Sequence, residues 1–162
     1  MTAARGRPYG RPAATAQKWA TRLHASSFRA TAGRVGGRIV DSPVLLLNAV
    51  GRKTGRRHTT LLLYLRDDDR YVTVASNGGT RDHPVWWTNL KANPEATVEV
   101  GGRKVRVRAK EAGSEEKARL WPKLVERYPG YESYQRKTER EIPVVVLHPA
   151  GSEPSSFHPY SP

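Results

Sequence analysis

Two nearly unbroken apolar runs, one near each end of the central part of the chain, most constrain how it can fold. They are residues 44–50 (VLLLNAV), bounded by Pro43 and Gly51, and residues 142–148 (IPVVVLH). A strand with apolar side chains on both faces is stable where both faces are covered. We therefore predict that residues 44–50 form a strand buried on both faces and that residues 142–148 form a last strand, fully apolar in its middle. The core is expected from residues 43–148 rather than from the ends of the chain.

The other predicted strands come in pairs. Residues 59–65 and 71–76 flank an acidic turn at residues 66–70, as in a hairpin. Residues 95–100 and 104–110 flank Gly101-Gly102 and alternate between apolar and polar side chains, as in a hairpin with one face in water. The alternation places Ala96, Val98, Val100, Val105, Val107 and Ala109 inward, and Glu95, Thr97, Glu99, Lys104, Arg106, Arg108 and Lys110 outward.

Short helices are predicted between and after the hairpins. Residues 84–91 begin with a proline and stop at Asn93-Pro94. We expect a helix capped by Ser114 that is interrupted before Pro122 and restarts there, and another opened by Pro129-Gly130. Six mostly antiparallel strands with helices predict a mainly β fold (α+β). An antiparallel barrel with the helices outside is the economical arrangement, because closure removes sheet edges.

The positive charge of the chain is concentrated in two places. Lys and Arg number 28 against 15 Asp and Glu, a net charge of +13. Residues 1–40 hold eight basic residues and no acid, residues 41–111 hold 13 basic and eight acidic residues, and the remainder is neutral. We therefore divide the chain into a basic arm (1–40), a body (41–149) and a flexible tail (150–162). Within the arm we expect disorder over residues 1–16 and a short cationic amphipathic helix over residues 17–32.

Several classes of protein are excluded by what the sequence lacks. Without cysteine there is no disulfide scaffold, zinc ribbon or thiolate chemistry. No run of about 18 apolar residues could span a membrane, and no secretory signal is evident. The five histidines lack metal-ligand spacing, so no metal site is predicted. We expect a soluble, cytoplasmic protein.

A basic loop follows the first apolar run. Residues 51–58 (GRKTGRRH) hold four Arg or Lys and no acid. The glycines permit a tight turn in which backbone N–H groups and cationic side chains converge on an oxyanion. A solvated hairpin turn has the same composition, so both interpretations stand. The spacing of a nucleotide-binding phosphate loop is absent.

Two further segments have the chemistry of a ligand site. The small residues 76–79 (SNGG) would let a flat ligand approach the backbone, although a turn with positive φ needs the same residues. Tyr128, Tyr131 and Tyr134 lie close together along the chain. A wall of hydroxyl-bearing rings suits a planar organic substrate, and an exposed tyrosine-rich helix face is the alternative.

Ordered short motifs extend from residue 42 to residue 148, about two thirds of the chain. The motifs are Gly51-Arg52-Lys53-Thr54-Gly55, residues 60–65, Arg70-Tyr71-Val72, residues 75–79 (ASNGG), His83-Pro84-x-Trp86, residues 89–94 (NLKANP), Trp121-Pro122, Tyr128-Pro129-x-Tyr131 and residues 142–145 (IPVV). As a series they resemble the deazaflavin (coenzyme F420)-dependent nitroreductase and quinone reductase family.

The resemblance implies a split β-barrel similar to the FMN-binding split barrels. It also implies an oxidoreductase that transfers a hydride from reduced coenzyme F420 to a quinone, a nitroaromatic compound or another electron-poor acceptor. FMN in place of the deazaflavin is the alternative cofactor. Coenzyme F420 is a flat ring joined to a polyanion, which consists of a phosphodiester and an oligoglutamate tail. The cofactor carries the chemistry, so the protein contributes mainly orientation.

By the same resemblance, three groups of residues form the site. Arg52, Lys53 and Thr54, with Arg57 or His58, hold the anionic part of the coenzyme. The residues that border its ring are Leu62, Leu63, Ala75, Ser76, Asn77, Gly78 and Trp86. Tyr128, Tyr131 and Tyr134 line the acceptor pocket, where one of them bonds the substrate or donates a proton, and Ser76 is grouped with them as catalytic.

Three positions depart from the family pattern. Asn77 stands where lysine is frequent, so one contact to the coenzyme's anionic part is expected to be missing. His58 stands where arginine is common, which makes that contact weaker or dependent on pH. Leu61 replaces a frequent proline.

The charge also admits two macromolecular partners. The arm and the outward cations of residues 104–110 could neutralise nucleic-acid phosphates, but no nucleic-acid-binding motif accompanies them. The arm could instead lie on anionic lipid and bring the enzyme to membrane quinones as a peripheral protein. The sequence therefore favours an anionic coenzyme and a membrane surface over a nucleic acid.

Overall fold

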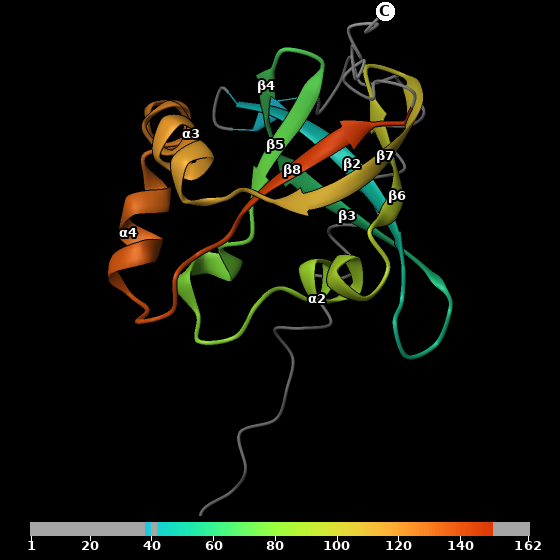
Figure 1. Ribbon diagram of the computed structural model, residues 1–162, viewed down its shortest axis with the longest axis horizontal. Coiled ribbons are helices and arrows are strands. Elements are labelled where there is room, and N and C mark those ends of the chain that lie inside the picture. Colours follow the sequence, from blue (N-terminus) through green and yellow to red (C-terminus); the bar gives the residue numbers. More distant parts are fainter. Residues whose placement is uncertain (1–37, 40–41, 151–162) are drawn as a thin grey trace, which may run out of the picture.

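A computed structural model describes residues 38–39 and 42–150 (Figure 1). The disorder, the amphipathic helix and the tail predicted for the two ends of the chain lie outside these residues, apart from Ala150. The strands are β1 (Arg38–Ile39), β2 (Ser42–Val50), β3 (Arg57–Leu63), β4 (Leu65–Asp67), β5 (Arg70–Val74), β6 (Glu95–Val100), β7 (Arg103–Glu111) and β8 (Val144–Pro149). The helices are the short 3-10 turn η1 (Asn77–Gly79), α2 (Val85–Ala92), α3 (Ser114–Arg127) and α4 (Gly130–Arg136).

The strands form one antiparallel sheet that curls toward closure. Its order is β1-β2-β6-β7-β8-β5-β4, and β3 also pairs with β2. Strands β3 and β4 are therefore edge strands at opposite ends of the curl, yet only Tyr64 separates them along the chain. The Tyr64 N–H donates to the Pro43 carbonyl at 3.1 Å. Because one residue joins the two edges, the sheet bends into a barrel, as the pairing of hairpins predicted.

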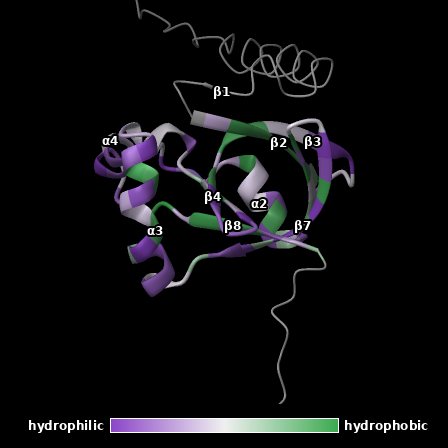
Figure 2. Ribbon diagram, turned by 90° about the horizontal axis from the view of Figure 1, so that it is seen from above, coloured by the Kyte–Doolittle hydropathy of each residue, from purple (hydrophilic) through white to green (hydrophobic). Residues whose placement is uncertain are grey.

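The barrel interior is filled from all sides. Leu45 and Leu47 of β2, Val98 of β6 and Val145 of β8 are fully buried in one cluster with Trp86 and Trp87 of α2. Seen from above, α2 lies within the ring of strands (Figure 2). The helix therefore plugs one end of the barrel, and the burial of both tryptophans stabilises it there.

Helices α3 and α4 lie on the outer side of the barrel (Figure 1). Their buried residues Leu120, Leu124 and Tyr131 pack against Val72, Val74, Val144 and Val146 of β5 and β8. This outer cluster covers the second face of β8, so all of residues 144–147 are completely buried. The two-sided burial predicted for residues 44–50 is confirmed over residues 44–49 of β2, whereas Val50 at the end of the strand is exposed.

Two predicted boundaries were wrong. The strand predicted over residues 59–65 starts at Arg57 and divides at Tyr64, because Leu63 pairs with Val44 of β2 whereas Leu65 pairs with Val72 of β5. The predicted break before Pro122 is absent, and α3 runs through it. Leu120 and Leu124 are four residues apart on one buried face, so tertiary packing outweighs the hydrogen bond that the proline removes.

Two side-chain predictions also need correction. Ser114 does not cap α3, because the N-cap is Gly113 and no side chain bonds the first turn. Glu99 was expected in water but is only 6% exposed. Its cross-strand partner Leu46 is fully buried, so this part of the outer face is covered, and Lys104 places its Nζ 3.8 Å from the Glu99 carboxylate.

Candidate functional site

The basic loop between β2 and β3 is a closed turn with its cations in solvent. The Gly51 N–H donates to the Arg56 carbonyl at 2.7 Å and the Gly55 N–H to the Gly51 carbonyl at 2.8 Å, while Gly55 has a φ of +68°. Residues 52–58 are all exposed. The backbone is therefore fixed while the cationic side chains are accessible, which is the arrangement an anion-binding loop needs.

A buried amide in α2 anchors this loop. Asn89 is 2% exposed, and its Oδ1 accepts hydrogen bonds from the Arg52 backbone N–H at 3.2 Å and from Arg52 Nη1 at 3.1 Å. Asn89 thereby orients one predicted anion-binding side chain. The sequence analysis missed it, although a polar residue on the face that carries Trp86 and Leu90 was a usable signal.

The segment after β5 has an unusual backbone. Asn77, Gly78 and Gly79 have φ values of +47°, +67° and +77° in succession. The Asn77 amide Nδ2 donates to Thr80 Oγ1 at 2.7 Å and to the Asp82 carbonyl at 3.0 Å. The side chain that replaces the family's lysine therefore closes its own turn. Asn77 and Gly78 remain exposed on a short, flat stretch of backbone.

The same segment lies against α4. A Cβ atom on Gly79 would stand 2.5 Å from the Tyr134 carbonyl oxygen and 2.8 Å from the Tyr134 Cα. Only glycine permits this approach of the two backbones. The strand-end segment and the tyrosine helix, 55 positions apart in sequence, are therefore held together at this point.

The three predicted tyrosines form one cluster. Their ring centroids lie 5.0 to 6.5 Å apart, and the Tyr128 and Tyr134 hydroxyls are 3.1 Å from each other. The hydrogen bond to Tyr134 raises the pKa of Tyr128 above its ordinary value. Tyr131 is only 6% exposed, and burial raises its pKa well above that of a free tyrosine. The hydroxyls of Tyr128 and Tyr131 are therefore protonated at neutral pH, and the buried Tyr131 ring packs edge-on against the rings of Tyr128 and Tyr134.

The predicted ring-bordering residues do not all share one face. Leu62 packs against the interior cluster that contains Trp86, whereas Leu63 packs against Val44 and Leu46 on the opposite face of β2. Neighbouring residues of a strand point to opposite faces. Of the two leucines, only Leu62 therefore presents its side chain on the face of the sheet that carries Trp86.

One residue that the sequence analysis did not single out connects these parts. Arg140, between α4 and β8, donates hydrogen bonds to the carbonyls of Ala75, Ser76 and Thr80. No motif or spacing marked it, because its contacts depend on the chain returning from α4 past the end of β5.

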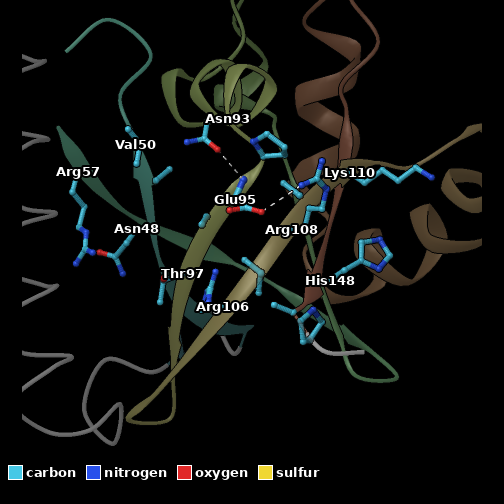
Figure 3. A pocket seen from close by; sticks show the side chains of 17 residues that line it. Asn48, Val50, Arg57, Asn93, Glu95, Thr97, Arg106, Arg108, Lys110 and His148 are labelled. Atoms are coloured by element: carbon cyan, nitrogen blue, oxygen red, sulfur yellow. Dashed lines mark hydrogen bonds and ion pairs between the residues drawn. The ribbon is translucent and has the colours of Figure 1, made fainter. Parts of the chain in front are cut away.

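A separate cavity of about 1110 Å³ lies over β2, β6, β7 and β8 (Figure 3). Its lining residues include the cations Arg57, Arg106, Arg108 and Lys110, together with His148. Arg108 Nη1 lies 3.6 Å from the Glu95 carboxylate, and burial lowers the pKa of His148. Of the predicted site residues only Arg57 lines this cavity. The predicted outward face of residues 104–110 thus contributes to a cationic groove distinct from the tyrosine cluster.

Comparison with known proteins places this arrangement in a class. The heme storage protein of Vibrio cholerae superposes with a TM-score of 0.50 at 15% identity, covering 80% of this chain and 89% of that one, a likeness of fold alone. An F420-H2 dependent reductase (FDR-A) superposes with a TM-score of 0.62 at 37% identity, covering 68% and 98%. The fold is thus the split β-barrel shared by these proteins, and the predicted fold class is confirmed.

The sequence comparisons narrow the class to a family. An F420H(2)-dependent quinone reductase of Mycobacterium tuberculosis is 45% identical over 130 residues, which cover 78% of this chain and 87% of that protein. The family model described as F420H(2)-dependent quinone reductase matches residues 19–149. The chain belongs to the F420H2-dependent quinone reductase family, which confirms the resemblance seen in its motifs.

Proposed function

We propose that this protein transfers a hydride from reduced coenzyme F420 to a quinone. The observation that carries the proposal is its membership of a family of F420H2-dependent quinone reductases, with 45% identity to a relative of that name over most of the chain. The arrangement of the site supports it, because an exposed cationic loop, a flat stretch of backbone and a pair of tyrosine hydroxyls are the parts such a reaction needs.

The cationic loop fits the anionic part of the coenzyme. Arg52, Lys53 and Arg57 are exposed and form no ion pair with any residue of the described ranges 38–39 and 42–150. Their charge is therefore available for charge-assisted hydrogen bonds to phosphate or carboxylate oxygens. Asn89 holds Arg52 in place before the ligand arrives, which reduces the entropy lost on binding.

The backbone of residues 75–79 fits a flat ring. Its residues with positive φ leave Asn77 and Gly78 exposed, so that few side-chain atoms cover this part of the backbone. Leu62 and Trp86 supply apolar surface from the barrel. When bound, the reduced deazaflavin supplies the hydride, and these residues bind the ring and orient it toward the acceptor.

The tyrosine pair fits the delivery of a proton to the acceptor. One of the Tyr128 and Tyr134 hydroxyls donates to the other at 3.1 Å, so the accepting hydroxyl keeps its own proton for a bond to a substrate oxygen. A quinone that gains a hydride needs one proton to become a hydroquinone. We assign this proton to the Tyr128–Tyr134 pair, with Ser76 beside the coenzyme and Tyr131 as the buried support of the pair.

Binding of the coenzyme tests the cationic loop. We expect the protein to quench the fluorescence of oxidised F420 on binding, and Lys53→Gln to weaken binding by about tenfold or more, because a charged hydrogen bond is lost. Lys123→Gln removes the same charge from the exposed surface of α3 and serves as the control. Equal affinities of the two variants would remove Lys53 from the site, and tight binding of FMN instead of F420 would replace the proposed cofactor.

The range of acceptors and the cellular location are finer proposals. We include nitroaromatic compounds among the acceptors because they accept a hydride at the same kind of planar, electron-poor centre.

We also propose that the protein associates peripherally, through its basic arm, with anionic membranes, which hold the membrane quinones. In the part of the chain that is described, no helix is long and apolar enough to span a bilayer.

A further inference from the structure

The guanidinium of Arg140 spans both ends of the segment proposed to border the coenzyme ring. Nε donates to the Thr80 carbonyl at 2.9 Å and Nη2 to the Ser76 carbonyl at 2.8 Å. Both terminal nitrogens also lie 3.4 Å from the Ala75 carbonyl. One side chain thus bridges the two residues that follow β5 and the residue that follows η1.

The bridged segment needs such support. Residues 77–79 all have positive φ, and Asn77 is not a glycine, so its backbone is in a conformation that L-residues rarely adopt. The Ala75 N–H donates to the Pro143 carbonyl at 2.9 Å, and beyond it the segment has short-range backbone bonds, from Gly79 N–H to the Ser76 carbonyl at 2.9 Å and from Thr80 N–H to the Asn77 carbonyl at 3.3 Å, beside the turn-closing bonds of the Asn77 side chain. Strained backbone of this kind persists where its surroundings over-determine it.

Arg140 is itself fixed to the tyrosine helix. Gln135 of α4 donates from Nε2 to the Arg140 carbonyl at 2.9 Å and accepts at Oε1 from the Ile142 N–H at 3.0 Å. Gln135 directly follows Tyr134, the residue whose backbone contacts Gly79. A continuous chain of hydrogen bonds therefore connects the helix that carries Tyr134 with the segment at Ser76.

We infer that Arg140 is a positioning residue which fixes the coenzyme-bordering segment relative to the Tyr128–Tyr134 pair; this inference rests on the proposed function. Hydride transfer requires the ring and the acceptor at near-contact distance, and small misplacements greatly lower the rate. Arg140 touches neither the reacting atoms nor the tyrosine hydroxyls. It acts by holding the carbonyls of Ala75, Ser76 and Thr80 against α4. The segment with these carbonyls would carry the coenzyme ring, and α4 would contact the acceptor.

His83 makes this support sensitive to protonation. Its Nδ1 lies 3.2 Å from Arg140 Nη1. Arginine is a donor only, so Nδ1 accepts and the imidazole is neutral with its proton on Nε2. Burial lowers the pKa of His83, as do the charges of Lys91 on α2 and Arg140, whereas Glu111 of β7 and Asp82 act in the opposite direction. Below that pKa, imidazolium replaces an acceptor with a second cation beside the guanidinium, which loosens the support.

Hydrogen exchange and kinetics together test the inference. In Arg140→Gln we expect faster exchange of the Gly79 and Thr80 amides and a fall in kcat/KM of about tenfold to a hundredfold with F420H2 and a quinone. Arg140→Lys keeps the charge, but its compact ammonium lacks the planar fork of donors on separate nitrogens that spans the Ser76 and Thr80 carbonyls, so we expect little rescue of activity. Arg136→Gln removes a neighbouring charge that is paired with Glu132 at 3.9 Å, and serves as the control.

A pH profile separates positioning from mere stability. Wild-type kcat/KM should fall on acidification through the pKa of His83, whereas in His83→Gln, whose amide oxygen accepts from Arg140 at any pH, this fall should be absent. Unchanged exchange of the Gly79 and Thr80 amides in Arg140→Gln, or a lower melting temperature with unchanged kcat/KM, would overturn the inference. If the wild-type protein binds no F420, the proposed function fails, whereas the exchange result still decides whether Arg140 holds the segment.

Discussion

At the scale of single residues, Asp67 shows how one carboxylate ties a hairpin to a helix. It ends β4, is 9% exposed, and accepts two hydrogen bonds from Arg119 of α3 at 3.0 and 2.9 Å, in addition to a bond from Arg70 of β5. These bonds, those from Arg119 above all, hold the pKa of Asp67 well below its usual range. The sequence analysis assigned this residue only to an acidic turn.

The depressed pKa sets a direction for stability against pH. The stabilisation by Asp67 is complete above the carboxyl's unfolded pKa of about 4 and is lost as the pH falls toward the lower folded pKa. We expect Asp67→Asn to lower the free energy of unfolding by about 2–3 kcal/mol at neutral pH, because charged hydrogen bonds are lost. The difference from wild type should shrink in acid. Urea unfolding at several pH values measures it.

The neighbouring Asp69 offers a matched control. It is exposed on the same turn, so Asp69→Asn removes the same charge without removing a buried contact. We expect an effect within about 0.5 kcal/mol. If Asp67→Asn lowered the free energy of unfolding equally at low and at neutral pH, the stabilisation would not come from the ionised carboxylate.

Composition marked the parts of the candidate site that lie in continuous motifs but left a structural alternative open for each, and the family resemblance supplied their expected roles. Residues 51–58, residues 75–79 and the three tyrosines are each a short run whose composition marks it. Asn89 and Arg140 were not predicted, because the roles of both depend on contacts between segments 37 and up to 65 positions apart. Asn89 had one signal in the sequence, its place on the helix face of Trp86 and Leu90, whereas nothing marked Arg140 before the fold brought the segments together.

At the scale of elements, the strands were predicted where side-chain patterning and burial agree. The apolar runs in β2 and β8 and the alternation in β7 follow from which faces are covered, whereas in β6 the buried Glu99 departs from the alternation. The division at Tyr64 was not predicted, because residues 59–65 are uniformly strand-like and only the change of partner from β2 to β5 separates β3 from β4. Local patterning cannot show a change of partner.

The proline inside α3 gives a test at this scale. Pro122 is exposed, and it removes the bond that a residue at this position would donate to the Ala118 carbonyl. We expect Pro122→Ala to raise the free energy of unfolding by about 1–2 kcal/mol, less than the full helix penalty of proline because alanine also makes the unfolded chain more flexible. Urea unfolding followed by circular dichroism measures the change.

Pro129 provides the comparison for that prediction. It is exposed and occupies the N-cap of α4, where no intrahelical N–H bond is lost. Pro129→Ala should therefore leave stability unchanged or lower it slightly. If both substitutions stabilised the protein equally, the missing bond in α3 would not be the cause.

At the scale of the whole molecule, the charge separates into three regions with different roles. The cations of the loop at residues 51–57 serve the proposed coenzyme site, and those of β7 line the groove over β2, β6, β7 and β8. Residues 1–37 add seven Arg or Lys and no acid. The first two regions lie within the described residues, whereas the third lies outside them, and an anionic partner for it is our proposal.

Flotation with lipid vesicles tests whether the basic arm binds an anionic membrane. Each basic residue near an anionic membrane surface contributes about 1 kcal/mol, and apolar residues such as Trp19 and Leu23 add burial in the interface. We expect the full chain to float with vesicles rich in phosphatidylglycerol at low salt, and to be released by high salt because screening weakens the attraction. A chain that begins at Arg38 keeps β1 and should remain unbound.

The groove is the competing explanation for any binding to anionic vesicles. A full-length variant with Arg106→Gln, Arg108→Gln and Lys110→Gln removes three of its cations and leaves the arm intact. Because the groove is concave and a bilayer is flat, we expect this variant to float with anionic vesicles as the wild type does. Neither protein should float with uncharged phosphatidylcholine vesicles. Equal flotation of the full chain and the chain from Arg38 would assign membrane binding to the body instead, and loss of flotation in the groove variant would place it on β7.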